Sequence, residues 1–113
     1  MASKLLPYSV LTLMTLSGFN YTTHYQHPKV ENKPYVLFVH GFPSSAYDWR
    51  HQVDHFAHEG YGIIAPDTLG YGGSSKPLNP HDYTLKTITD SLVEVVDKVA
   101  GKKAKVLGVG HDW

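Results

Sequence analysis

The sequence predicts an α/β fold in which a mostly parallel sheet is layered with helices. Residues 35–39 form a continuous apolar run of strand length, which suits a strand buried on both faces. Residues 62–66 and 105–109 are also expected to be strands, and amphipathic helical patterns at 46–59 and 84–100 separate the three segments. Buried strands that alternate with amphipathic helices are typical of a parallel sheet with helical layers.

Apolar side chains recur at helical spacing in both predicted helices. They are Trp49, Val53, Phe56 and Ala57 in the first helix, and Leu85, Ile88, Leu92, Val95 and Val99 in the second. Gly60 is expected to close the first helix. Thr84 is expected to cap the amino end of the second helix, and Gly101 follows its last turn.

The start of the chain predicts two antiparallel strands at residues 10–16 and 19–26, with Gly18 between them. Segment 27–34 is polar and bounded by prolines, and segment 67–80 is dense in Gly, Pro, Ser and Asn, so both are expected to be loops. No internal repeat or linker marks a second domain. The predicted order is an antiparallel strand pair followed by parallel β-α-β-α-β.

Length and composition indicate a globular chain. It has 113 residues, enough for one domain or part of one, of which 42% are hydrophobic and 18% are charged. Lys plus Arg and Asp plus Glu are both 10, so the formal net charge is zero, which gives no electrostatic reason to expect nucleic acid or an anionic membrane as a partner. The absence of cysteine excludes disulfides, a thiol nucleophile and thiolate metal ligands.

The first 16 residues weakly resemble a signal peptide, because an apolar stretch follows Lys4. Pro7 interrupts that stretch, and no cleavage site of the Ala-x-Ala kind follows it. The stretch is also too short and too polar to span a membrane. We therefore expect a strand here, no signal peptide, no membrane span and a cytoplasmic location.

Three loops follow the three predicted parallel strands, at residues 40–45, 67–76 and 110–113. Ligands of open α/β sheets bind outside the carboxyl ends of the strands, so these loops form the expected site. Residues 108–113 match the front half of a nucleophile elbow, a sharp strand-to-helix turn that exposes a reactive side chain. Asp112 occupies the position where serine is usual; a chain end without a special turn is the alternative.

Three motifs together resemble the α/β-hydrolase superfamily and, within it, the epoxide hydrolases. They are His40-Gly41-Phe42-Pro43, Asp67-Thr68-Leu69-Gly70-Tyr71-Gly72-Gly73-Ser74 and Gly110-His111-Asp112-Trp113. Their order and spacing fit the family, and the likeness extends from about Gly18 to Trp113. It implies an α/β-hydrolase fold of which residues 1–113 form only the N-terminal half, a partial core domain that ends at the elbow. The cap domain and the C-terminal half of the core would lie outside this chain.

An aspartate nucleophile favours attack on a saturated carbon. Attack on an acyl group would give an anhydride, whereas attack on an epoxide or an alkyl halide gives an alkyl ester that activated water can cleave. The backbone N–H groups of Phe42 and Trp113 are the expected donors to the oxyanion formed when water attacks this ester. Gly41 allows close approach of the backbone, Pro43 fixes the turn, and His40 is expected to hold the loop rather than to transfer protons.

Two positions distinguish the members of the superfamily. Haloalkane dehalogenases usually have Asn at the position of Phe42, and fluoroacetate dehalogenases usually have Arg at the position of Trp113. The resemblance therefore favours an epoxide hydrolase that converts a hydrophobic epoxide to a diol without a cofactor. A haloalkane or fluoroacetate dehalogenase is the alternative.

The resemblance also implies groups that follow the elbow in the family. Epoxide hydrolases use a histidine to activate water, an acid to orient it, and cap-domain tyrosines to protonate the epoxide oxygen. We therefore expect residues 1–113 alone to be inactive, and a non-catalytic truncated product is a second hypothesis. Residues 105–109 lie centrally in the family's sheet, so this chain is expected to leave an apolar edge unpaired and to be poorly soluble.

Two further motifs have competing interpretations. Gly108 and Gly110 begin a dinucleotide-binding fingerprint, but the bulky Trp113 stands where the third glycine should be. Asp67 is expected to cap a loop rather than to act in catalysis.

Three histidines lie on one face of the first predicted helix: His51, His55 and His58. Such a group could bind a metal ion. Because this face is opposite the apolar one, a solvated surface is the favoured interpretation, and no metal site is predicted.

Overall fold

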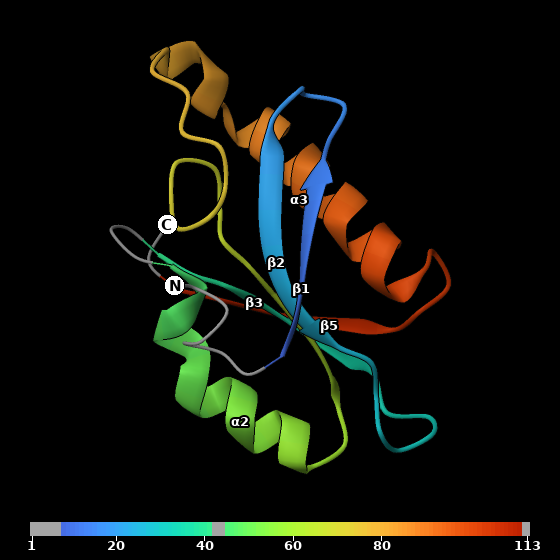
Figure 1. Ribbon diagram of the computed structural model, residues 1–113. Coiled ribbons are helices and arrows are strands. Elements are labelled where there is room, and N and C mark those ends of the chain that lie inside the picture. The colour runs from blue at the N-terminus through green and yellow to red at the C-terminus, as the bar shows by residue number, and fades with distance from the viewer. Residues whose placement is uncertain (1–7, 42–44, 112–113) are drawn as a thin grey trace.

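The computed structural model describes residues 8–41 and 45–111. Four predicted site residues lie outside these ranges: Phe42, Pro43, Asp112 and Trp113. Within the described part of the chain, five strands form one sheet in the order β1-β2-β4-β3-β5. The strands are β1 (Ser9–Met14), β2 (Asn20–Gln26), β3 (Tyr35–Val39), β4 (Gly62–Pro66) and β5 (Val106–Gly110). Helices α2 (Arg50–His58) and α3 (Leu85–Ala100) lie on opposite sides of the sheet (Figure 1), which confirms the predicted α/β layers.

Strands β1 and β2 form the predicted antiparallel pair. Their register places Thr12 opposite Thr22, and the two hydroxyl oxygens lie 3.2 Å apart. β2 also pairs antiparallel with β4, although β3 lies between them in sequence. The N-terminal hairpin is therefore continuous with the parallel part of the sheet.

Strands β4, β3 and β5 are the predicted parallel strands. β3 and β4 have the expected bounds, and β5 is shifted by one residue from the expected 105–109. Every residue of β4 is buried. β5 lies at one end of the sheet, where Leu107 and Val109 are 49% and 37% exposed. It therefore forms an apolar edge of the described sheet.

The helix expected at 46–59 begins with a 3₁₀ turn, η1 (Ala46–Trp49), before α2 starts. The Ser45 hydroxyl accepts a hydrogen bond from the backbone N–H of Tyr47, and a carboxylate from another loop accepts one from Ala46. These side-chain acceptors satisfy N–H groups of the first turn. The expected apolar face is confirmed, because Val53 and Ala57 are buried and Trp49 and Phe56 pack against the same core.

Helix α3 begins and ends as predicted. The Thr84 hydroxyl accepts the Thr87 backbone N–H at 3.2 Å, and Gly101 follows the last turn with φ +82°. The expectation that Leu85 belongs to the apolar stripe is wrong, since its side chain is 75% exposed. Burial in α3 begins only at Ile88, so the expected apolar face does not extend into the first turn of the helix.

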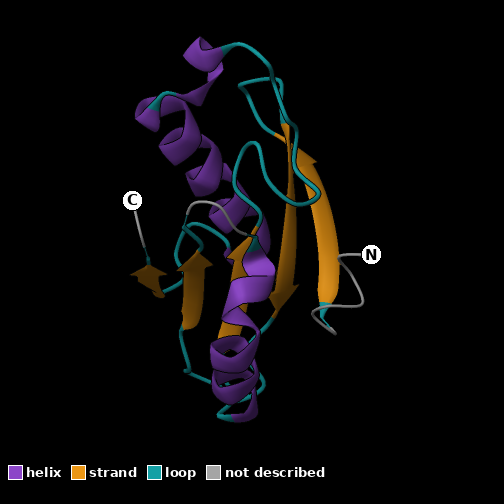
Figure 2. Cartoon of the chain, turned by 90° about the vertical axis from the view of Figure 1, so that its left-hand side faces the viewer, coloured by secondary structure: helices purple, strands orange, loops and turns teal. Residues whose placement is uncertain are grey.

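Each side of the sheet has its own hydrophobic core. The core on the α2 side contains Val36, Phe38, Ala46, Val53, Ala57, Ile63 and Ala65. The core on the α3 side contains Tyr21, Tyr35, Ile64, Leu69, Ile88, Val95 and Val99. Neighbouring residues of β4 alternate between the two cores, as expected for a strand between two helical layers. Figure 2 shows both helices and the strands between them.

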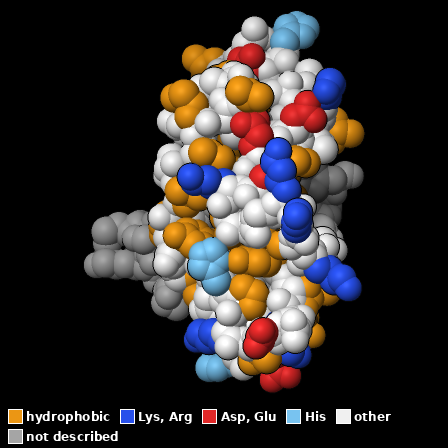
Figure 3. All heavy atoms as spheres, turned by 90° about the vertical axis from the view of Figure 1, so that its right-hand side faces the viewer, with side chains coloured by type: hydrophobic (Ala, Val, Ile, Leu, Met, Phe, Trp, Pro, Cys, Tyr) orange, Lys and Arg blue, Asp and Glu red, His pale blue; other side chains and the backbone are white. Residues whose placement is uncertain are grey.

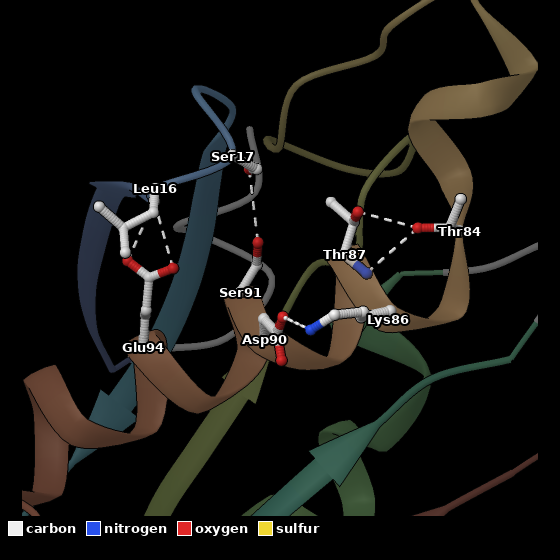
Figure 4. A network of polar contacts seen from close by, with 8 residues as sticks. All are labelled: Leu16, Ser17, Thr84, Lys86, Thr87, Asp90, Ser91 and Glu94. Carbon is white, nitrogen blue, oxygen red and sulfur yellow. Dashed lines mark hydrogen bonds and ion pairs between the residues drawn. The ribbon is translucent and has the colours of Figure 1, made fainter.

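A network of polar contacts ties the turn between β1 and β2 to α3 (Figure 4). The Thr15 hydroxyl lies 3.0 Å from the hydroxyl of Ser91, which is 1% exposed. The Leu16 backbone N–H donates to both carboxylate oxygens of Glu94, at 3.1 and 3.2 Å. These contacts join segments more than 70 residues apart, so the hairpin is part of the same packed unit.

The face of the molecule that carries α3 mixes apolar and charged side chains of both signs (Figure 3). Its exposed apolar residues include Val93, which is 54% exposed. Among the helices that the structure describes, none has the length and apolar character needed to cross a membrane.

Candidate active site

The register of the parallel strands brings the three predicted loops to one edge of the sheet. β3 pairs with β5 so that Val39 lies opposite Gly110, and the segments that follow these two residues begin at neighbouring strand ends. β4 lies on the other side of β3 and ends at Pro66. The three motif-bearing loops therefore begin at adjacent strand ends, where ligands of open α/β sheets bind.

His40 is fully buried and connects two of these loops. Its Nε2 atom accepts the Thr68 backbone N–H at 2.9 Å, and its Nδ1 atom lies 2.9 Å from the Gly41 carbonyl oxygen. A nitrogen that accepts an N–H cannot carry a proton, so these contacts define the neutral tautomer with the proton on Nδ1. The imidazole thus attaches the start of the 40–45 loop to the backbone of the 67–76 loop.

Asp67 makes a second connection between the same loops. Its side chain is 2% exposed; Oδ1 accepts the Ala46 backbone N–H at 2.8 Å, and Oδ2 accepts the Gly73 backbone N–H at 3.0 Å. Bonds from backbone N–H groups to a carboxylate are stronger than those between neutral groups. The predicted loop-capping role of Asp67 is confirmed, but one carboxylate caps two loops.

The 67–76 loop is tightly folded around Asp67. Gly72 has φ +54°, and a Cβ atom there would lie 2.3 Å from the Asp67 carboxyl carbon. The Ser74 hydroxyl accepts the Thr22 backbone N–H at 2.9 Å, and the Thr22 hydroxyl donates to the Gly73 carbonyl at 2.9 Å. The loop is therefore fixed against β2 as well as against the 40–45 loop.

A cavity of about 230 Å³ opens beside the ends of β3 and β5. It is lined by His40, Gly41, Asp48, Trp49, Gln52 and His111. Residues of two predicted motifs and residues of η1 and α2 therefore line the same cavity. Asp48 and Gln52 were not singled out from the sequence, because helical spacing gives the face of a residue but not the loops opposite it.

His24 is a third residue that sequence reasoning missed. It lies in β2, is 2% exposed, and its Nδ1 atom has no hydrogen-bond partner in the part of the chain that the structure describes. Burial lowers the pKa of His24 from its ordinary value of 6.5, and the nearby Asp67 carboxylate opposes this shift. β2 is mostly polar in sequence, so no hydrophobic alternation marked His24 as buried.

The lowered pKa of His24 predicts a loss of stability in mild acid. The unfolded chain takes up a proton at His24 near pH 6.5, whereas the folded chain resists protonation until a lower pH. The free energy of unfolding should therefore fall as the pH drops below about 6.5. Urea unfolding at pH 7 and pH 5 would measure this loss. His24→Gln should reduce it and the exposed control His55→Gln should not; equal pH dependence in all three proteins would contradict the assignment.

Neither the two glycines of the dinucleotide-binding fingerprint nor the three histidines of the first helix form the arrangement that ligand binding would need. Gly108 and Gly110 both lie within β5, rather than in a strand-to-helix turn that could hold a pyrophosphate. His51, His55 and His58 are exposed on α2. Over residues 8–41 and 45–111, no three histidine or carboxylate side chains are grouped as metal ligands.

The protein-family model described as alpha/beta hydrolase fold matches residues 34–113 of this chain. The chain belongs to the α/β-hydrolase fold family. Epoxide hydrolase A of Mycobacterium tuberculosis is 46% identical over 80 residues, which cover 71% of this chain and 24% of that protein. Epoxide hydrolase 3 of Siraitia grosvenorii is 45% identical over 80 residues, covering 71% of this chain and 25% of that protein. The chain thus spans about a quarter of the length of these α/β-hydrolase relatives.

Solved structures give the same result over more of the chain. A crystal structure of an epoxide hydrolase from Vigna radiata has a TM-score of 0.78 at 31% identity, covering 93% of this chain and 30% of that one. Epoxide Hydrolase A from Mycobacterium thermoresistibile has a TM-score of 0.74 at 33% identity, covering 93% and 31%. The predicted fold, the N-terminal half of an α/β-hydrolase core resembling epoxide hydrolases, is therefore confirmed.

Proposed function

We propose that residues 1–113 supply the nucleophile and the oxyanion donors of an epoxide hydrolase. The pairing of Val39 with Gly110 carries this proposal. Phe42 and Trp113 each follow one of these paired residues by three positions, and Asp112 precedes Trp113. The segments that carry the two predicted N–H donors and the predicted nucleophile thus begin at adjacent strand ends. The relatives of this chain include named epoxide hydrolases.

The proposed reaction has two steps. A carboxylate oxygen of Asp112 attacks a ring carbon of the epoxide, a C–O ester bond forms, the ring C–O bond breaks, and the freed alkoxide takes up a proton. Water then attacks the ester carbonyl, and the backbone N–H groups of Phe42 and Trp113 stabilise the resulting oxyanion. Cleavage of the acyl C–O bond releases a diol and restores Asp112.

The remaining catalytic groups are proposed to come from the rest of an α/β-hydrolase, of which this chain is a partial core domain. They are the histidine that activates water, its acid partner and the tyrosines that protonate the epoxide oxygen. A polypeptide of residues 1–113 alone should then give no sustained diol production. Incubation with an aryl epoxide, with Asp112→Asn as the control, would test this. Turnover above that control would contradict the inactivity.

A chimeric protein, called the joined protein below, tests the function itself. Residues 1–113 would be fused to the part of Epoxide hydrolase A that follows its matched region, because the two proteins are 46% identical over that region. A single turnover in ¹⁸O-labelled water should give diol with unlabelled oxygen and place ¹⁸O in the Asp112 carboxyl group. The label would appear in the diol if water attacked the epoxide directly, which would contradict the covalent mechanism.

The dehalogenase alternative is tested in the same joined protein. Phe42 and Trp113 favour an epoxide over an alkyl halide, because neither side chain offers the Asn or Arg that the dehalogenases usually place there. Release of halide from a haloalkane or from fluoroacetate, without diol from an epoxide, would favour the alternative.

A further inference from the structure

The loop that contains Phe42 is held at both ends by one neighbouring segment. At its start, His40 is bound to the backbone N–H of Thr68. At its end, the backbone N–H of Ala46 is bound to Asp67. Thr68 and Asp67 are consecutive residues, so both ends of the loop are bound to the segment that follows β4.

The two ends are held by different chemistry. His40 is a neutral acceptor, whereas Asp67 is a buried carboxylate whose two oxygens each bind a different loop. Ala46 is 0% exposed, so a lost bond there would leave a buried N–H without its acceptor. Asp67 therefore fixes the position of Ala46 relative to Gly73.

We propose that Asp67 is a positioning residue for the second step of the reaction: it fixes the end of the loop that carries Phe42, whose N–H is a proposed donor to the oxyanion of the ester. This inference rests on the proposed function. Asp67 binds the backbone N–H of Ala46, which directly follows the 40–45 loop, so its proposed effect on catalysis is indirect.

The two chemical steps depend on this donor differently. When Asp112 attacks the epoxide, negative charge leaves its carboxylate and moves to the epoxide oxygen. When water attacks the ester, negative charge returns to a former carboxylate oxygen, and only then do the N–H donors gain interaction energy. A displaced Phe42 N–H should therefore slow ester hydrolysis and leave ester formation almost unchanged.

Two variants break the contact from opposite sides. Asp67→Asn keeps one acceptor oxygen but turns an NH₂ group toward the second backbone N–H, so one of the two bonds is lost. Ala46→Pro removes the N–H donor and leaves Asp67 unchanged. Proline is tolerated at the first position of a helical turn, and the preceding Ser45 has the extended backbone, φ −154° and ψ 177°, that proline requires. The matched control is Asp54→Asn, which makes the same substitution at an exposed carboxylate on α2.

Amide hydrogen exchange on the 113-residue chain tests the contact without activity. In Asp67→Asn, amides at residues 45–47 and at Gly73 should exchange about tenfold faster, while those of β4 remain as in the parent. The Asp54→Asn control should match the parent at every site. Unchanged exchange in the loop would overturn the role of Asp67.

Single-turnover kinetics in the joined protein tests the catalytic consequence. Both variants should form the ester on Asp112 at nearly the parent rate and hydrolyse it about 10- to 100-fold more slowly, so that the alkyl-enzyme accumulates in mass spectra. Equal losses in both steps would indicate a merely structural role and would overturn the proposal, as would no loss in either step. If the parent joined protein forms no ester, the proposed function fails, and the exchange result still decides whether Asp67 holds the loop.

Discussion

Addition of a single methyl group at Gly72 is expected to lower the free energy of unfolding by about 3 kcal/mol. The Cβ atom of Gly72→Ala would lie 2.3 Å from the carboxyl carbon of Asp67, closer than any real contact allows. Asp67 cannot move aside without releasing Ala46 or Gly73, so the clash and the loss of a hydrogen bond are coupled. Urea unfolding of the variant and the parent would measure the difference.

Substitution of a second glycine distinguishes the energetic cost of the clash from the cost of backbone strain. Gly18 also has a positive φ, +90°, but no atom of the residues that the structure describes lies within 4 Å of its added Cβ position. Gly18→Ala should therefore cost only about 1 kcal/mol. In an Asp67→Ala background the Gly72→Ala substitution should cost much less than in the parent, because the carboxylate is gone. Strictly additive losses would show that the two residues do not interact.

The free edge of β5 predicts that the 113-residue polypeptide self-associates. Val109→Lys should weaken this association and raise its dissociation constant at least about tenfold. Leu107 and Val109 are exposed on β5, whose outer backbone groups have no partner strand in the described sheet. An added lysine places a desolvation penalty on pairing with another strand. Because Val109 is already 37% exposed, its replacement should change the unfolding free energy little.

Analytical ultracentrifugation over a range of concentrations would measure this association. Leu78→Lys is the matched control, since Leu78 is 98% exposed but lies in a loop rather than on a strand edge. Equal suppression by both substitutions would attribute the association to general hydrophobicity. A parent polypeptide that stays monomeric at all concentrations would contradict the prediction.

The parts of the fold that depend on local patterns were predictable from the sequence. The apolar runs gave β3 and β4 their bounds, and the Thr84 hydroxyl and Gly101 marked the ends of α3. Leu85 failed because helical spacing defines a face but not how far the neighbouring layer extends. Ser91 shares the buried face three residues after Ile88, a position that spacing alone could have identified.

The parts of the site that depend on contacts between loops were not predictable. The dual role of Asp67 requires Ala46 and Gly73 to converge on it from segments 21 residues before it and 6 residues after it. The motif comparison identified these loops but not the bonds between them. The burial of His24 likewise depends on β4 lying beside β2, and no sequence pattern in either strand predicts this pairing.

The strand order has a consequence for how the chain folds as it is synthesised. β2 emerges before β3, but its inner neighbour in the sheet is β4, which ends at Pro66. A nascent chain that stops before Gly62 can form the β1–β2 hairpin only as an isolated ribbon, and such ribbons are marginally stable in water. Synthesis of β4 joins both halves of the sheet at once, since it pairs with β2 on one side and β3 on the other. We therefore expect the first protease-resistant nascent chains to be those in which residues 62–66 have left the ribosome.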